Sequence, residues 1–136
     1  MTLSLPLSNK VIVLTRSKEQ AEDSIHKLES LGAEVLPFPT INIAKAEDYT
    51  EFDKYSAELS DYDFVIFTSA NAVKFSAERW RELDITLPSK IKIAAVGNKT
   101  AEVCEKEKIA VNIIPDNFSA EGLINYFKLE KIEGKK

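Results

Sequence analysis

The chain has 136 residues, of which 44% are hydrophobic and 29% charged, so it suits one domain, or one small domain with an appendage, around a packed core. Its formal net charge of −4 argues against a nucleic-acid-binding protein, which needs a basic surface. No apolar run approaches the roughly 20 residues of a membrane span, and residues 1–8 lack the features of a signal peptide, so we expect a cytoplasmic protein without membrane contact.

The first elements are a strand predicted over residues 10–15 and a helix over 18–31, in which apolar residues recur at helical spacing. A second strand is predicted over 34–36. Two prolines then follow at positions 37 and 39, and they prevent a central β-ladder. We therefore expect residues 37–46 to form an extended, exposed connector between domains.

Strand and helix patterns alternate through the rest of the chain, which predicts an α/β fold in which helices flank a parallel sheet. The run Phe64–Phe67 is apolar on both faces, as a buried parallel strand is. In chain order, we expect helices over 47–59, 71–83 and 100–106, strands over 64–67, 92–96 and 111–114, and a last helix that opens at Ser119 and buries Leu123 and Ile124. Residues 131–136 look like either the lead-in to another strand or a frayed tail.

Small polar turns join the strands to the helices. Because parallel strands place their carboxyl ends on one edge of a sheet, the following helices point free N–H groups at that edge, where they attract anions. After the first strand come Thr15 and Arg16, and Arg16 could pair with a carboxylate while Ser17 caps the helix. The alternative is a capped helix with a solvated arginine.

The later turns are open to the same two interpretations. Residues 68–71 are either a cap cluster or a nest of donors for a ligand oxygen. Gly97 permits close approach of the backbone to a ligand, but residues 96–100 match neither a P-loop nor a dinucleotide-binding fingerprint. Ser119 is predicted to cap the last helix.

Several kinds of catalytic site are excluded. The single cysteine, Cys104, rules out an internal disulfide, and it falls on the apolar face of a helix, where we expect a small buried hydrophobe rather than a reactive thiol. One histidine supports neither a zinc site nor a catalytic triad. We therefore expect no metal site, and an enzyme of this kind would work by positioning and hydrogen bonding.

Taken in order, these turns resemble the uroporphyrinogen-III synthase family. The matching stretches are 14–16 with Gln20, 31–35 with Pro37 and Pro39, 62–73, 95–101, 114–115 and 119–123. The resemblance implies cofactor-free cyclisation of the linear tetrapyrrole hydroxymethylbilane, with inversion of ring D and loss of water. Such a lyase belongs to tetrapyrrole and heme biosynthesis, and its substrate carries many carboxylates.

The resemblance also implies a fold of two flavodoxin-like α/β domains joined by a connector, with the substrate between them. Residues 1–36 would belong to domain 1, 37–46 to the connector, 47–130 to the main α/β domain, and 131–136 would lead to a second half that is missing here. Thr100 would be a hydrogen-bond donor to the substrate and the candidate catalytic residue. The cleft would be lined by Thr68, Ser69, Ala70, Asn71, Gly97, Asn98, Thr100, Ser119 and Ala120, and we add Thr15 and Arg16 from the first turn.

The chain matches only the first half of the family pattern, so the tyrosine often proposed to assist departure of the hydroxyl has no counterpart here. Residues 11–31 would also lack their usual neighbours. We therefore expect a homodimer in which two copies exchange this first strand–helix unit, or else a monomer in which the unit folds back on its own sheet. A non-catalytic α/β module that binds an acidic ligand or dimerises is the alternative function.

Overall fold

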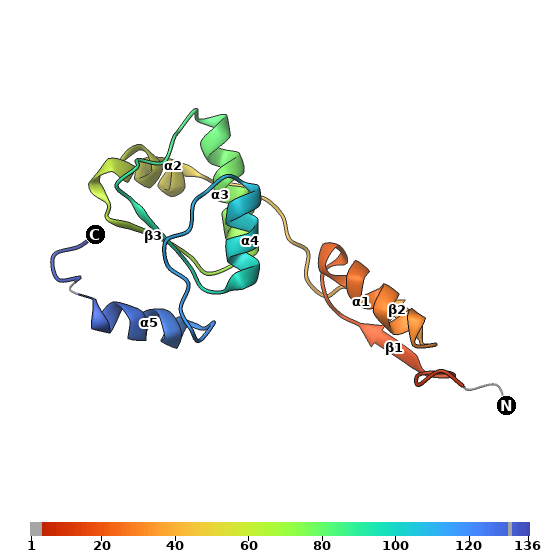
Figure 1. Ribbon diagram of the computed structural model, residues 1–136. Coiled ribbons are helices and arrows are strands. Elements are labelled where there is room, and N and C mark those ends of the chain that lie inside the picture. The colour runs from red at the N-terminus through yellow and green to blue at the C-terminus, as the bar shows by residue number, and fades with distance from the viewer. Residues whose placement is uncertain (1–3, 131) are drawn as a thin grey trace. The chain divides into compact units, whose positions relative to one another are not determined.

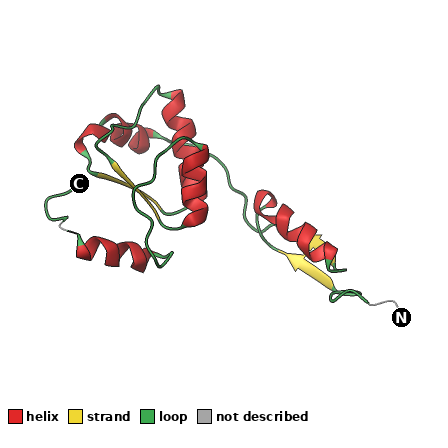
Figure 2. Cartoon of the chain, in the orientation of Figure 1, coloured by secondary structure: helices red, strands yellow, loops and turns green. Residues whose placement is uncertain are grey.

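The computed structural model describes residues 4–130 and 132–136, in two compact units that span Met1–Ala46 and Glu47–Lys136 (Figure 1). Strands and helices alternate from β1 to α4, and α5 follows α4 without a strand between them (Figure 2). All pairings between the named strands are parallel. The predicted α/β class, with parallel strands flanked by helices, is therefore confirmed.

The first unit contains β1 (Val11–Leu14), α1 (Lys18–Ser30) and β2 (Glu34–Pro37). The strands pair in parallel from Val11↔Glu34 to Leu14↔Pro37, so β2 runs one residue beyond its predicted end. Gly32, with a φ of 92°, lets the chain turn after α1 into the left-handed region that side chains disfavour.

One face of this two-stranded sheet is open and mostly apolar, and Glu34 is the charged residue on it. Side chains alternate along a strand, and paired residues of parallel strands project to the same side. Val11 (58% exposed) and Val13 (56%) share a face with Leu36 (47%), whereas Ile12, Leu14 and Val35 on the other face are half-buried.

The second unit is built around β3 (Phe64–Phe67) and β4 (Lys92–Ala95), which pair in parallel from Phe64↔Lys92 to Phe67↔Ala95. A single parallel bridge joins Ala94 to Ile113 on the far side of β4. The helices are α2 (Thr50–Ala57), α3 (Ala70–Glu82), α4 (Asn98–Lys106) and α5 (Ala120–Leu129), with the 3-10 turn η1 (Leu59–Asp61) after α2.

The helix expected over 100–106 begins two residues earlier, at Asn98, and two other predicted elements of this unit differ more strongly in the structure. The helix expected from residue 47 begins at Thr50, because the Asp48 carboxylate accepts hydrogen bonds from the Thr50 N–H (2.8 Å) and hydroxyl (2.6 Å). The strand expected over 111–114 is reduced to the bridge at Ile113. There the side-chain oxygen of Asn112 accepts the Ile93 N–H at 2.8 Å, in the place of a backbone carbonyl.

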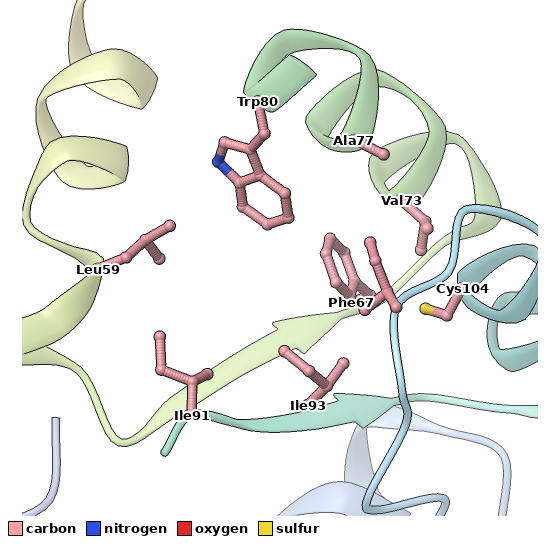
Figure 3. Close-up of a cluster of buried hydrophobic side chains, with 9 residues drawn as sticks. Leu59, Phe67, Val73, Ala77, Trp80, Ile91, Ile93 and Cys104 are labelled. Atoms are coloured by element: carbon pink, nitrogen blue, oxygen red, sulfur yellow. The ribbon is translucent and has the colours of Figure 1, made fainter. Parts of the chain in front are cut away.

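The core of this unit lies between the β3–β4 pair and helices α3 and α4, as Figure 3 shows. Trp80 stacks on Phe52 and meets Phe67 edge-on, and its indole N–H donates to the buried Ser56 hydroxyl at 2.8 Å. Cys104 is fully buried, and desolvation raises the pKa of its thiol, which confirms its predicted role as a small hydrophobe.

The exposure of two apolar residues was predicted wrongly. Ile66 of β3 is 46% exposed although its strand was expected to be buried on both faces, because β3 lies at the edge of its sheet and one of its faces is only partly covered. Ile124 of α5 is 53% exposed, whereas its neighbour Leu123 is buried.

The end of the chain is attached to the start of β3. The Lys136 carbonyl accepts hydrogen bonds from the N–H groups of Asp63 (2.7 Å) and Phe64 (3.2 Å). The Lys135 ammonium pairs with the Asp63 carboxylate at 3.0 Å, and the two lysines lower the pKa of that carboxyl through hydrogen bonds. Residues 132–136 therefore lie beside the first residues of β3.

A two-pronged ion pair joins α2 to α3. Arg79 donates from Nε to Asp53 Oδ1 (2.9 Å) and from Nη2 to Oδ2 (2.6 Å), and a third hydrogen bond reaches Glu82. These hydrogen bonds from Arg79 hold the pKa of the Asp53 carboxyl below its ordinary value. The pair therefore stabilises the fold only while Asp53 is ionised.

We predict that Asp53→Asn lowers the melting temperature at pH 7 and reduces the further fall of the melting temperature when the solution is acidified. A carboxyl whose pKa is depressed by folding contributes stability above its unfolded pKa of about 3.9, and this contribution is lost as the pH falls through the folded pKa. Melting curves at pH 7 and about pH 2.5 measure the effect. Glu105→Gln, at an exposed position on α4, is the control; an unchanged pH profile for Asp53→Asn would contradict the assignment.

Candidate functional site

Three helix starts share one edge of the second unit. β3, β4 and Ile113 are adjacent and parallel, and the chain after them opens α3, α4 and α5. The ends are held level because the Val96 N–H donates to the Phe67 carbonyl (3.0 Å) and the Ala95 N–H to the Ile113 carbonyl (2.9 Å). This edge, called the carboxyl edge below, holds the predicted residues Thr68, Ser69, Ala70, Asn71, Gly97, Asn98, Thr100, Ser119 and Ala120.

Serines cap two of these helices. Ser69 Oγ accepts the Ala72 N–H at 3.1 Å, and Ser119 Oγ accepts the Gly122 N–H at 3.1 Å. The capping interpretation of both serines is therefore confirmed. In each cap the hydroxyl oxygen only accepts a hydrogen bond, so the hydroxyl hydrogen remains able to donate elsewhere.

The third helix, α4, has no such cap. Its N-cap is Gly97, which has no side chain to accept a hydrogen bond. The first N–H groups of an α-helix have no intrahelical acceptor, and the positive end of the helix dipole lies beside them. The start of α4, with the exposed Asn98 on it, is therefore the part of the carboxyl edge that most favours an anion.

Thr100 lies in this first turn of α4. Its backbone N–H donates to the Gly97 carbonyl at 3.1 Å, and its side chain is only 5% exposed. A ligand group that reaches the start of α4 would meet the Thr100 hydroxyl together with the free N–H groups.

At the two glycines of the carboxyl edge, other residues of the chain occupy the space that a side chain would need. A Cβ atom on Gly97 would lie 3.0 Å from Cβ and 3.2 Å from Cγ of Phe118, so the space expected to admit a ligand is taken by this aromatic residue. A Cβ atom on Gly122 would lie 1.8 Å from the Asn117 carbonyl oxygen. Phe118, which is 56% exposed, was missed by the sequence reasoning, although it directly precedes the cap Ser119.

The other two predicted residues belong to the first unit. Thr15 and Arg16 follow β1 and are exposed, and the Thr15 carbonyl accepts from the N–H and hydroxyl of Thr40, both at 3.2 Å. Ser17 is the N-cap of α1, but its side chain makes no capping hydrogen bond, and its buried Oγ has no partner among the residues that the structure describes. The expected cap at Ser17 is therefore wrong, because its hydroxyl accepts none of the first N–H groups of α1.

The described residues hold no group of three or more His, Cys, Asp or Glu side chains that would suit a metal ion. In the same part of the chain, no helix is long and apolar enough to cross a membrane.

The fold and the carboxyl edge define an α/β protein of the parallel class, in which ligand sites lie beyond the carboxyl ends of the strands. The sequence model of the family described as uroporphyrinogen-III synthase HemD matches residues 22–136. The chain belongs to this family, as its ordered turns predicted.

Similar proteins agree with this assignment. A uroporphyrinogen-III synthase from Synechococcus elongatus is 32% identical over 129 residues, which cover 90% of this chain and 47% of the relative. A solved structure of a mutant uroporphyrinogen III synthase from the extremely thermophilic bacterium Thermus thermophilus has a TM-score of 0.66 and 18% identity, and the match covers 86% of this chain and 47% of that one. The solved structure supports the fold. The chain spans about half the length of these relatives.

We predict that Ser69→Ala lowers the stability of the second unit by about 1 kcal/mol, as the loss of an N-cap does. Ser69→Asp should retain most of the stability, because its carboxylate accepts the same Ala72 N–H and also favours the positive end of the helix dipole. Urea unfolding of the three proteins measures the difference. If both variants were destabilised equally, the contribution of Ser69 to stability would not come from capping α3.

Proposed function

We propose that this chain binds hydroxymethylbilane along the carboxyl edge and takes part in its cyclisation by a uroporphyrinogen-III synthase. The observation that carries this proposal is the convergence of α3, α4 and α5 on one edge, with the start of α4 left without a side-chain cap. The family assignment supports the same chemistry. The reaction closes the macrocycle with inversion of ring D, and the hydroxyl of the substrate leaves as water.

The acidic substrate fits a site built from backbone N–H groups. Such groups attract carboxylates without adding formal charge, so a chain with a net charge of −4 can still bind a polycarboxylate. In this proposal Ala70, Asn98 and Ala120 contribute mainly through the N–H groups at the three helix starts. The substrate would be fixed by several such contacts at once, with no metal or cofactor involved.

Side chains of the edge would add directed hydrogen bonds. Thr100 is the proposed donor to a substrate oxygen, since it carries a hydroxyl in the first turn of α4. Thr68 and Asn71 lie beside the Ser69 cap and supply further polar groups. From the first unit, we propose that Thr15 and the guanidinium of Arg16 contact another carboxylate of the substrate.

An alternative function follows from the length of the chain, which is about half that of its relatives. A chain that spans about half of its relatives can retain the binding edge and lack groups that the whole reaction needs. The alternative function is therefore a non-catalytic module that binds the acidic tetrapyrrole. Supplying hydroxymethylbilane from the preceding enzyme and measuring the cyclised uroporphyrinogen III distinguishes the two. Product above the uncatalysed level supports catalysis, whereas tetrapyrrole binding without product supports the module.

We predict that Thr100→Val weakens binding of uroporphyrin I, a stable tetrapyrrole octacarboxylate, by about tenfold, as the loss of a hydrogen bond to a charged group does. Valine keeps the shape of the side chain and removes only the hydroxyl. Fluorescence titration of the porphyrin gives the dissociation constants, and Thr86→Val, at an exposed position before β4, is the matched control. Binding by Thr100→Val as tight as by the wild type would remove Thr100 from the site.

We also propose the organisation predicted from the resemblance. Residues 1–36 act as the strand–helix unit of domain 1, 37–46 as the connector, 47–130 as the main domain and 131–136 as a lead-in, in a cytoplasmic protein. The open face of the first unit, with Val11, Val13 and Leu36 about half exposed, supports a homodimer by exchange of this unit. Covering that face would remove apolar surface from water.

We predict that the chain sediments at micromolar concentration with twice its mass of 15.2 kDa. Val13→Lys places a charge on the open face and should yield monomers, because burying that charge in a dimer is costly. Ile124→Lys, at a similarly exposed position on α5, should leave the dimer intact. A wild-type monomer at this concentration would contradict the exchange.

A further inference from the structure

We infer that Phe118 is a ring-stacking residue of the carboxyl edge and that its exposed face receives a pyrrole ring of the bound tetrapyrrole. This inference rests on the proposed function and goes beyond it, since it assigns a role to a residue that neither the turn motifs nor the family resemblance singled out. It starts from two observations on Phe118, its contact with Gly97 and its exposure.

Phe118 lies between two helix starts. It directly precedes Ser119, the N-cap of α5, and its Cβ and Cγ lie against Gly97, the N-cap of α4. A Cβ on residue 97 would approach both atoms to within 3.0–3.2 Å, so only glycine leaves the ring where it is. The base of the Phe118 side chain is therefore held against the backbone, close to the free N–H groups of α4.

The ring nevertheless remains open to a ligand. Phe118 is 56% exposed, although it packs against the backbone of Gly97. The other strongly exposed aromatic residues of the described chain lie elsewhere: Phe38 (66%) follows β2, and Tyr55 (46%) is on α2. Of these aromatic surfaces, Phe118 is the one located beside helix starts on the carboxyl edge.

The chemistry of a tetrapyrrole fits this arrangement. Each pyrrole ring is flat and carries carboxylate arms, so a ring stacked on Phe118 would hold its arms beside the N–H groups at the starts of α4 and α5. An aromatic face beside hydrogen-bond donors that bind anions selects a ligand that is both flat and acidic. An aliphatic polycarboxylate would use only the donors.

A structural role for Phe118 makes a different prediction. An apolar residue just before an N-cap often packs on the fifth residue after itself as a hydrophobic staple, which here is the buried Leu123. A staple requires bulk and apolar character, and leucine supplies both. A stacking partner requires the ring, which leucine lacks and tyrosine retains.

The test compares Phe118→Leu and Phe118→Tyr in titrations with uroporphyrin I, with melting temperatures measured in parallel. We expect Phe118→Leu to weaken binding about fivefold, the size expected for the loss of one aromatic pair, and Phe118→Tyr to bind as the wild type does. Tyr55→Leu, at an exposed aromatic position on α2, is the matched control and should leave the affinity unchanged.

The outcomes separate this inference from the proposed function. If the wild type binds uroporphyrin I and Phe118→Leu binds equally well, the stacking role is wrong and the proposed binding function stands. If leucine and tyrosine weaken binding equally, the ring is not the recognised feature, and the stacking role is again wrong. If the wild type does not bind the porphyrin at all, the proposed function fails and the inference fails with it.

Discussion

The candidate site depends on the hydrogen bonding of β4 on both of its sides. β3 lies on one side, and the bridge to Ile113 lies on the other. Because all the contacts are parallel, the carboxyl ends of the three segments are level, and the helices that follow begin together. The small, fully buried side chains of Ala94 and Ala95 leave room for the covering helices to close over this strand. Without this pairing the turns would have no common edge.

The three helices that begin at the carboxyl edge differ in how their first N–H groups are satisfied. Ser69 and Ser119 satisfy helix N–H groups with their own hydroxyls, so the starts of α3 and α5 are stabilised from within the chain. At α4 the N-cap is Gly97, which offers no side-chain acceptor to the first N–H groups and leaves room for Phe118. Helix capping and the proposed ligand binding thus fall to neighbouring helices.

The two units differ in how far each buries its own apolar residues. The second unit encloses a core around Trp80, Phe67 and Cys104, and ion pairs such as Arg79–Asp53 tie its helices together. In the first unit, the β1–β2 sheet buries little on one face, where Val11 and Val13 are more than half exposed. Together with a length about half that of the relatives, this open face supports the proposal that the unit works against another polypeptide surface.

The sequence by itself determined the order of the helices and of the strands up to β4, the parallel α/β class, the cap at Ser119, the burial of Cys104 and the family. These follow from local periodicity and turn chemistry, which short stretches encode. Only the tertiary structure decided that Asn112 replaces a ladder bond, that Ile66 is exposed at a sheet edge, that Ser17 makes no cap and that Phe118 occupies the space beside Gly97. Each of these depends on how side chains meet residues distant in the chain or on the direction a side chain takes, and neither is encoded in a local pattern.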